Sequence, residues 1–247
     1  MRKRSFYIIL SACLIMLSAC GPDLKLAKQA YKNGDYAIAI AQWEALSEFG
    51  IPKAHLELAK VYAKGTGVER DLDMSLALLN KAIAENENSL ARPILQVKSI
   101  IGSEFLRHGN SKFQTIGRTY LEAAKEAGHP KAFFELARMY EEGYGVSKNA
   151  TKAIALYTTS ADMGYTRALY YQGRMFYRGK TVRRNYKRAL ELYLSAYDQG
   201  YSKVAVDIGR IYEKGLGVPI NIEAAKSYYT IASKNGVARA TKYLSRL

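Results

Sequence analysis

Ten basic residues recur at two fixed positions along the chain, and basic side chains placed in this way are suited to binding anions. Each residue of the first set is followed seven residues later by one of the second, so both lie on one face of a helix. The first set is Lys53, Lys131, Arg167, Lys203 and Arg239, and the second is Lys60, Arg138, Arg174, Arg210 and Arg246. Rows of like charge repel one another and focus the potential of a concave surface, which favours an anionic partner. The alternative is that these residues are simply solvated, as Lys and Arg usually are.

An apolar strip is expected between the two basic rows. Three residues after the first cation the chain has Leu56, Phe134, Tyr170 and Val206. We therefore predict a groove in which two basic rows flank an apolar or aromatic strip, with Phe134 and Tyr170 among the residues that contact a partner.

Positive charge is densest in one stretch of the chain. Six cations occur there without an acid among them: Arg178, Lys180, Arg183, Arg184, Lys187 and Arg188. Tyr177 lies beside them, and Tyr and Arg are the residues enriched at interface hot spots. The chain as a whole has 37 Lys and Arg against 22 Asp and Glu, a net charge of +15. We predict that Tyr177, Arg178, Arg183 and Arg184 belong to the partner-binding site. Nucleic acid would suit the same composition, but a chain with the secretory leader described below is not expected to meet it.

No catalytic or metal-binding pattern is present in the sequence. The histidines His55, His108 and His129 lie far apart, and none belongs to an HExxH or similar pair. The glycines are not preceded by a strand and do not have the spacing of a phosphate-binding loop. We expect no enzymatic activity, no cofactor and no metal ion.

The elements that position the cations come from a repeat with a step of 36 residues. In residues 131–164, Ala132, Leu136 and Tyr140 follow helical spacing, which predicts a first helix, A, that ends at Gly143. Asn149 is suited to cap a second helix, B, from about Thr151 to Met163. The capping position recurs as Asp71, Asn185 and Asn221. Self-similarity at this period indicates a solenoid, because one helix pair cannot bury its apolar face alone.

We therefore predict an all-α solenoid of stacked antiparallel helix pairs over residues 20–247. The expected units are 23–50, 53–87, 89–128, 131–164, 167–200 and 203–236, with a capping helix at 238–247. From the repeat start near Leu90 to the next at Ala132 the step is 42 residues, six more than the usual 36. The first helix of this unit is expected from about Ser89 to Arg107. This insertion marks either the binding side of the array or a relaxed repeat. Trp43, Tyr157 and Tyr193 are expected in the core.

The repeat pattern resembles that of a known family. The order Ala-x3-Leu-x3-Tyr-x2-Gly-x-Gly-Val, followed by Asp or Asn, Ala, an aromatic residue and Gly, is similar to the Sel1-like repeat, a relative of the tetratricopeptide repeat. GTGV at 65–68, GYGV at 143–146 and GLGV at 215–218 fit this pattern, whereas GKTV at 179–182 departs from it at Thr181. The resemblance implies an interaction scaffold in which the cation-bearing side of helix A lines the concave surface.

The first twenty residues have the pattern of a secretory leader. Arg2, Lys3 and Arg4 precede an apolar run, which ends at Leu17-Ser18-Ala19-Cys20. This tetrapeptide resembles a bacterial lipobox, which implies that residues 1–19 are a removed signal peptide and that Cys20 carries the lipid. The alternatives are cleavage after Ala19 without lipid, or an uncleaved anchor. Gly21, rather than Asp, after the cysteine favours the outer membrane, with the chain facing the periplasm. Cys13 is lost with the leader, so no disulfide forms within the mature chain.

Residues 20–58 resemble the start of the AlgK family, the outer-membrane lipoproteins of alginate biosynthesis. The similarity is carried by Gly34, Asp35, Tyr36, Ala39, Leu46, Gly50 and Ala54. It implies a scaffold for exopolysaccharide export, with an export porin and periplasmic proteins as partners. Two alternatives remain open: a periplasmic adaptor or regulator of cell-envelope enzymes, and a direct binder of an anionic polysaccharide such as a polyuronate.

Overall fold

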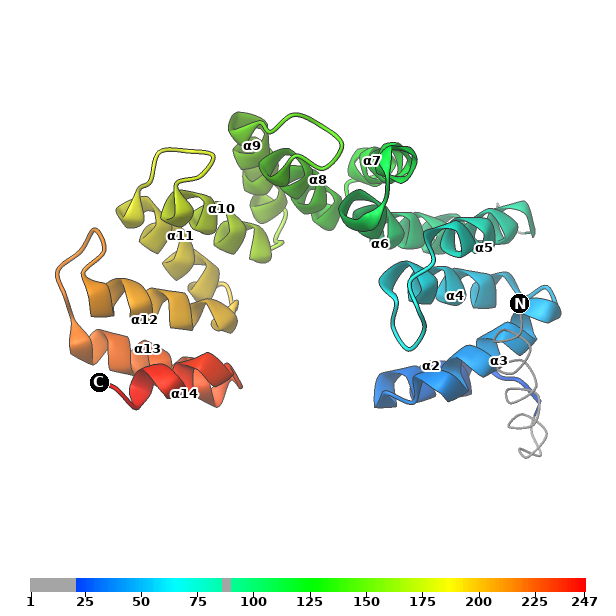
Figure 1. Cartoon of the computed structure of the whole chain (residues 1–247), viewed down its shortest axis with the longest axis horizontal. Coiled ribbons are helices and arrows are strands. Elements are labelled where there is room, and N and C mark those ends of the chain that lie inside the picture. Colours follow the sequence, from blue (N-terminus) through cyan, green and yellow to red (C-terminus); the bar gives the residue numbers. More distant parts are fainter. Residues whose placement is uncertain (1–20, 86–89) are drawn as a thin grey trace. The chain divides into compact units, whose positions relative to one another are not determined.

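The computed structural model describes residues 21–85 and 90–247, and regular structure in these ranges is helical throughout (Figure 1). The predicted all-α fold of paired helices is therefore confirmed. The predicted signal peptide, Cys20 and the expected helix start at Ser89 lie outside the described residues. The chain divides into two compact units, residues 1–124 and 125–247, which are described separately below. None of the helices in the described ranges combines the length and the apolar composition that crossing a bilayer requires.

The described part of unit 1 contains six helices in sequential pairs. They are α2 (Leu24–Asn33), α3 (Tyr36–Glu48), α4 (Pro52–Lys64), α5 (Leu72–Glu85), α6 (Ala91–His108) and α7 (Ser111–Glu126). Helix α4 contacts α3, α5 and α6, so successive pairs stack on one another. Trp43 is almost fully buried between α2 and α4, as the sequence predicts for a core residue.

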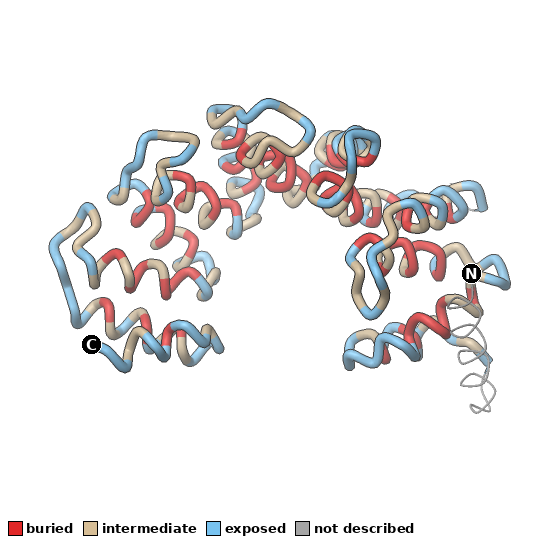
Figure 2. The backbone as a smooth tube through the Cα atoms, viewed as in Figure 1, coloured by how far each residue is buried: buried red, intermediate tan, exposed pale blue. Residues whose placement is uncertain are grey.

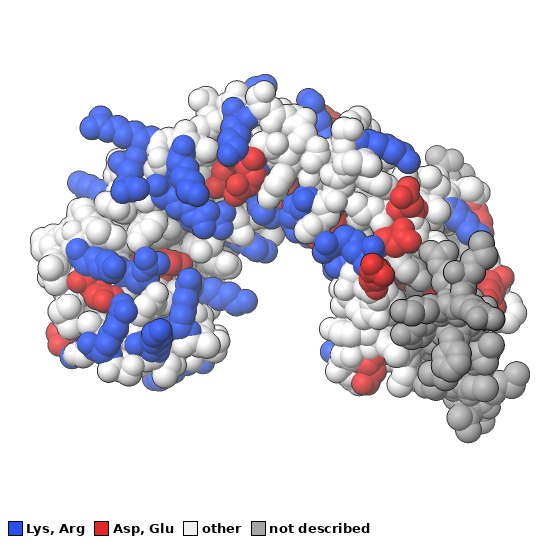
Figure 3. Space-filling model, in the orientation of Figure 1, with Lys and Arg blue, Asp and Glu red and all other residues white. Residues whose placement is uncertain are grey.

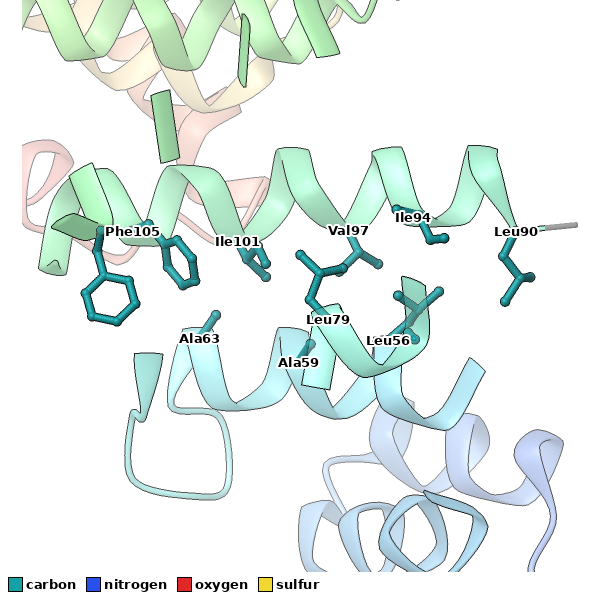
Figure 4. Close-up of a cluster of buried hydrophobic side chains, with 11 residues drawn as sticks. Leu56, Ala59, Ala63, Leu79, Leu90, Ile94, Val97, Ile101 and Phe105 are labelled. Carbon is teal, nitrogen blue, oxygen red and sulfur yellow. The ribbon is translucent and has the colours of Figure 1, made fainter. Parts of the chain in front are cut away.

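The largest core cluster of unit 1 lies between α4 and α6, with α5 at its side (Figure 4). Figure 4 shows Ala59 and Ala63 of α4 facing Val97 and Ile101 of α6 across this space. The small alanine side chains of α4 leave room for the longer side chains of α6. Burial of this apolar surface stabilises the stack by about 25 cal/mol per Å² removed from water.

Unit 2 repeats the pairing with three regular units and a final helix. The elements are α8 (Pro130–Glu142), α9 (Ala150–Asp162), α10 (Arg167–Arg178), α11 (Tyr186–Asp198), the 3-10 turn η1 (Ser202–Val204), α12 (Ala205–Lys214), α13 (Ile222–Lys234) and α14 (Ala238–Leu244). One tyrosine from each B helix is buried, namely Tyr157, Tyr193 and Tyr229. Figure 2 shows buried residues, in red, on both helices of each pair. Ala240 of α14 is buried against α13, so α14 covers the apolar flank of the last pair.

Helix ends in both units follow the predicted capping pattern. Oδ1 of Asn149 accepts a hydrogen bond from the backbone nitrogen of Lys152 at 2.9 Å, and Asp71, Asn185 and Asn221 cap their helices in the same way. Gly143 ends α8 with φ of 82°, a left-handed conformation that glycine adopts without steric cost. No described residue other than glycine has a positive φ, so Thr181 gives the α10–α11 loop a different backbone from its counterparts.

Candidate partner-binding site

The cation-bearing faces of successive A helices meet in unit 2. Nη2 of Arg174 on α10 lies 3.8 Å from Oε1 of Glu141 on α8. On the other side of α10, the Tyr170 hydroxyl donates a hydrogen bond to Asp207 of α12 at 3.3 Å. Arg239 of α14 reaches the same carboxylate at 3.2 Å. Within unit 2, side chains at these registers therefore contact the neighbouring A helices; that the cations of all repeats share one concave face stays a prediction.

Carboxylates interrupt the predicted basic rows. Arg138 is paired with Glu135 at 3.6 Å, and Arg210 with Asp207 at 3.8 Å. Arg246 likewise lies 3.0 Å from Glu213, and in unit 1 Lys60 is paired with Glu57. The second predicted row is thus interleaved with carboxylates in both units, which the prediction of two basic rows did not include. The signal for these acids was present in the sequence, because Glu57, Glu135 and Asp207 all stand four residues after the first cation.

The predicted apolar strip is wrong, because its residues belong to the core. Phe134 is 1% exposed and packs against Tyr157 and Tyr171, with ring centroids 5.7 and 4.9 Å away. Leu56 and Val206 at the same register are buried in the same way. Three residues after the first cation, the A helix faces its own B helix. Only Tyr170 at this register is partly exposed, and its pKa is raised to about 12, chiefly by burial and also by the charge of Asp207.

The remaining predicted contact residues differ in exposure. Lys53, Arg167 and Lys203, at the starts of their A helices, are exposed, and Lys131 is half-buried. Lys60, Arg138, Arg174 and Arg210 are partly buried by the ion pairs of the face. Tyr177 lies below Arg210, whose guanidinium carbon is 5.7 Å from the ring centroid.

The six cations between α10 and the first turn of α11 form an exposed surface that we call the basic turn. They are Arg178, Lys180, Arg183, Arg184, Lys187 and Arg188, and all six are exposed. Within the described part of the chain, only Arg188 has a carboxylate partner, Glu191 at 2.9 Å. Figure 3 shows Lys and Arg side chains projecting from this part of unit 2. The basic turn therefore has positive charge that nothing in the described chain neutralises.

Tyr171 lies at the centre of an arginine cluster, although it was not among the predicted contact residues. Its ring centroid is 4.2 Å from the guanidinium carbon of Arg174, 5.3 Å from that of Arg167 and 5.5 Å from that of Arg138. Nη2 of Arg167 also donates a hydrogen bond to the Tyr171 hydroxyl at 3.2 Å. Burial raises the pKa of Tyr171, but this hydrogen bond and the three positive charges outweigh burial and hold that pKa below its usual value. We call these four residues the arginine–tyrosine cluster.

The histidines do not assemble into a site. His55 is buried, with Nε2 3.2 Å from the carbonyl oxygen of Ser47 and Nδ1 2.9 Å from Glu85, so it joins three helices of unit 1. His108 is exposed at the end of α6, and His129 precedes α8. No group of three or more His, Cys, Asp or Glu residues within residues 21–85 and 90–247 is placed to hold a metal ion.

Comparison with known families identifies the repeat. The Sel1 repeat model matches residues 52–87, 130–165, 166–201 and 203–237. The matched segments leave out 23–50 and 89–128, the two units in which the glycine loop is absent. Protein sel-1 homolog 2 of Mus musculus is 34% identical over 138 residues, and the human protein of the same name is 33% identical. The matched region covers 53% of this chain but only 19% of either relative.

Solved structures show the same fold. A Sel1 repeat protein from Oxalobacter formigenes superposes with a TM-score of 0.62 over 90% of this chain and 88% of that chain, at 22% identity. A protective antigen of uropathogenic Escherichia coli strains with an SLR fold gives a TM-score of 0.55 over 90% of this chain and 47% of that one, at 24% identity.

Proposed function

The chain belongs to the Sel1 repeat family, and from this premise we propose that it is a protein-binding scaffold without catalytic activity. Stacked helix pairs present long side-chain surfaces, and scaffolds of this architecture use those surfaces to hold partners. Protein partners are thus the expected ligands of the repeats. The finer proposal is that the partner carries an acidic segment and that this segment docks on the basic turn.

The observation that carries this proposal is the exposure of the basic turn without compensating acids. Several other cations of unit 2, among them Arg138, Arg210 and Arg246, are instead held in ion pairs by carboxylates. Positive charges that face water without a partner repel one another, and an acidic segment offsets that repulsion while it steers association. Tyr177 and Tyr186, whose ring centroids are 5.4 Å apart, add aromatic surface beside the charges.

We further propose that the mature chain is anchored by lipid on Cys20 to the outer membrane, faces the periplasm and serves an exopolysaccharide export complex. Support comes from the lipobox-like sequence ending at Cys20 and from the resemblance of residues 20–58 to the alginate lipoproteins. The partners would then be an export porin and periplasmic proteins. The competing function is that of a periplasmic adaptor of cell-envelope enzymes, which uses the same basic turn.

The docking proposal is tested by charge reversal in the basic turn. Arg183→Glu, Arg184→Glu and Lys187→Glu together should abolish photo-crosslinking of the export porin and other partners in intact envelopes. The matched control reverses three exposed lysines elsewhere in unit 2, Lys214, Lys234 and Lys242, and should crosslink as the unaltered protein does. Equal crosslinking by the two triple variants would refute the assignment of the surface. Recovery of cell-wall enzymes in place of the porin would favour the adaptor function.

Anchoring is tested separately. The unaltered chain should incorporate labelled palmitate and sediment with outer-membrane vesicles, whereas Cys20→Ala should do neither. A soluble processed chain, or an unaltered chain that takes up no palmitate, would contradict the anchor. Direct polysaccharide binding is tested by retention on immobilised alginate. The scaffold proposal expects this retention to be weak, because Glu135 and Asp207 interrupt the row of cations that a polyuronate would need.

A further inference from the structure

Helix α10 differs from its neighbours at the two positions where they carry acids. Four residues after the first cation, α8 has Glu135 and α12 has Asp207, whereas α10 has Tyr171. Ten residues after it, α8 has Glu141 and α12 has Glu213, whereas α10 has Tyr177. Helix α10 therefore contains three arginines and no acid, although its neighbours each contain at least two acids.

Arg167 of α10 has no carboxylate partner among the described residues. In the next pair of repeats Asp207 pairs with Arg239, the first cation of the repeat that follows. Tyr171 stands in the place of that acid in α10, so Lys203 has no such partner. Arg174 finds Glu141 and Glu142 at 3.8 Å in the preceding repeat, and Arg138 finds Glu135 in its own helix. In the described chain, the polar side-chain partners of Arg167 are tyrosine hydroxyls, among them that of Tyr171. A phenol accepts a hydrogen bond but does not neutralise a guanidinium at neutral pH.

The Arg167 guanidinium is nevertheless held in place. It lies 5.3 Å from the ring centroid of Tyr171 and 5.6 Å from that of Phe134, and both rings are nearly fully buried. Such cation–π contacts and the hydrogen bond to Tyr171 reduce the rotamer freedom that Arg167 would lose on binding a ligand. The side chain is thus an exposed, oriented and uncompensated cation.

A second uncompensated cation lies across a shallow pocket. The pocket has a volume of about 310 Å³ and is lined by Arg167, Gly200, Tyr201, Ser202 and Lys203. Lys203 is exposed and, among the described residues, has no carboxylate partner. The hydroxyl groups of Tyr201 and Ser202 add hydrogen-bond donors to the two positive charges. The pocket therefore has the donor set of a carboxylate site.

We propose that this pocket binds a carboxylate side chain from an acidic segment of the protein partner. The proposal rests on the scaffold function above and assigns one specific subsite within it. Arg167 donates hydrogen bonds to the carboxylate, Lys203 supplies the second charge, and Tyr171 holds Arg167 from behind. The ligand carboxylate supplies the negative charge that Glu135 supplies in α8 and Asp207 in α12, and that α10 lacks.

The charge pattern favours a peptide over an anionic polysaccharide. A polyuronate presents a carboxylate on every sugar and needs a continuous row of free cations. On this face the row is broken on both sides of the pocket, because Arg138 pairs with Glu135, and Arg210 and Arg239 both pair with Asp207. One or two adjacent carboxylates on a peptide match a site confined to one repeat.

The test uses the full-length protein in detergent and a fluorescein-labelled hexaglutamate peptide, followed by fluorescence anisotropy. Arg167→Gln with Lys203→Gln should raise the Kd about tenfold or more, since each lost charge-assisted hydrogen bond is worth more than a neutral one. Tyr171→Glu should do the same without removing a cation, because it restores the acid of the neighbouring repeats. Lys214→Gln with Lys234→Gln, which changes the net charge equally, should leave the Kd within about twofold, as expected of distant screened charges.

The outcomes separate the inference from the proposed function. If the Kd for hexaglutamate is unchanged in the Arg167 and Lys203 double variant, the proposal that the pocket binds a carboxylate is overturned. This holds whatever the basic-turn variants do to partner crosslinking. Circular dichroism checks folding, and the double variant alone decides the result if Tyr171→Glu does not fold. Tighter binding of a uronate hexamer than of hexaglutamate would assign the pocket to a polysaccharide and overturn the peptide proposal. If partner crosslinking were lost only in the basic-turn variant and not in the Arg167 and Lys203 double variant, the scaffold proposal would stand and the pocket proposal would be overturned.

Discussion

The hydroxyl of Tyr157 donates a hydrogen bond to the buried carboxylate of Glu141 at 2.7 Å, and the pair joins helix B of one repeat to its own helix A. Tyr157→Phe should lower the free energy of unfolding by about 1–3 kcal/mol, because it leaves a buried carboxylate short of a donor. Urea denaturation followed by circular dichroism measures this loss.

The chain provides its own control for that measurement. Tyr193 occupies the same register in the next repeat, but Tyr177 stands there in place of the carboxylate, with ring centroids 6.4 Å apart. Tyr193→Phe should therefore cost less than Tyr157→Phe. Equal losses for the two variants would show that the carboxylate is not the reason for the effect.

A glycine in the last loop permits a close approach between repeats. Gly217 has φ of 72°, and a Cβ atom placed there would lie 2.9 Å from the backbone nitrogen of Lys187 in the preceding B helix. Gly217→Ala should destabilise unit 2 by about 1–3 kcal/mol, the range for strained backbone positions. Gly200→Ala meets a similar φ of 90° but open space, so thermal unfolding should show a smaller loss for it.

Tyrosine ionisation should divide into two groups as the pH rises. Tyr171 has a pKa below its usual value of 10.0, and Tyr157 has a raised pKa, chiefly because of burial and also because of Glu141. Absorbance at about 295 nm should therefore show Tyr171 ionising first, below about pH 10, and Tyr171→Phe should remove this early step.

The two shifts act on stability in opposite directions. The raised pKa of Tyr157 means that its contribution to stability is present below its unfolded pKa of about 10 and is lost as the pH rises. The lowered pKa of Tyr171 gives a contribution that is present above that value and is lost as the pH falls through its folded pKa. Tyr157→Phe should consequently weaken alkaline unfolding, whereas Tyr171→Phe should make it steeper. If Tyr171→Phe instead made alkaline unfolding less steep, the arginines of the arginine–tyrosine cluster would not be the cause of the lowered Tyr171 pKa.

A substitution at Asp207 should increase the affinity for an acidic peptide rather than reduce it. Asp207→Tyr gives α12 the residue that α10 carries at this register, and it releases Arg210 and Arg239 from their carboxylate. Hexaglutamate affinity should rise about threefold or more, in line with two uncompensated cations in a partly buried site. Unchanged affinity in a folded variant would show that tyrosine in place of acid is insufficient to make a site.

The 36-residue register predicted the local structure well, because capping and helix termination depend on residues close in sequence. Asn149 and Gly143 have the predicted roles, and Tyr157 is buried as expected. The register failed for Phe134 because it fixes which residues share a face, but not which face turns toward helix B. The role of Tyr171 did not follow from the basic register alone, because it depends on the acids that stand at the same position in α8 and α12.

Tandem copies of one sequence offer a ligand several equivalent binding sites. A ligand that binds all of them equally has no fixed position along the repeats. Tyr171 and Tyr177 in α10 remove this equivalence among the three helix pairs of unit 2, because α8 and α12 keep acids at both positions. On the pocket proposal, an acidic partner is then held at one repeat of unit 2. Two tyrosine side chains would thereby set the position of the partner along these repeats.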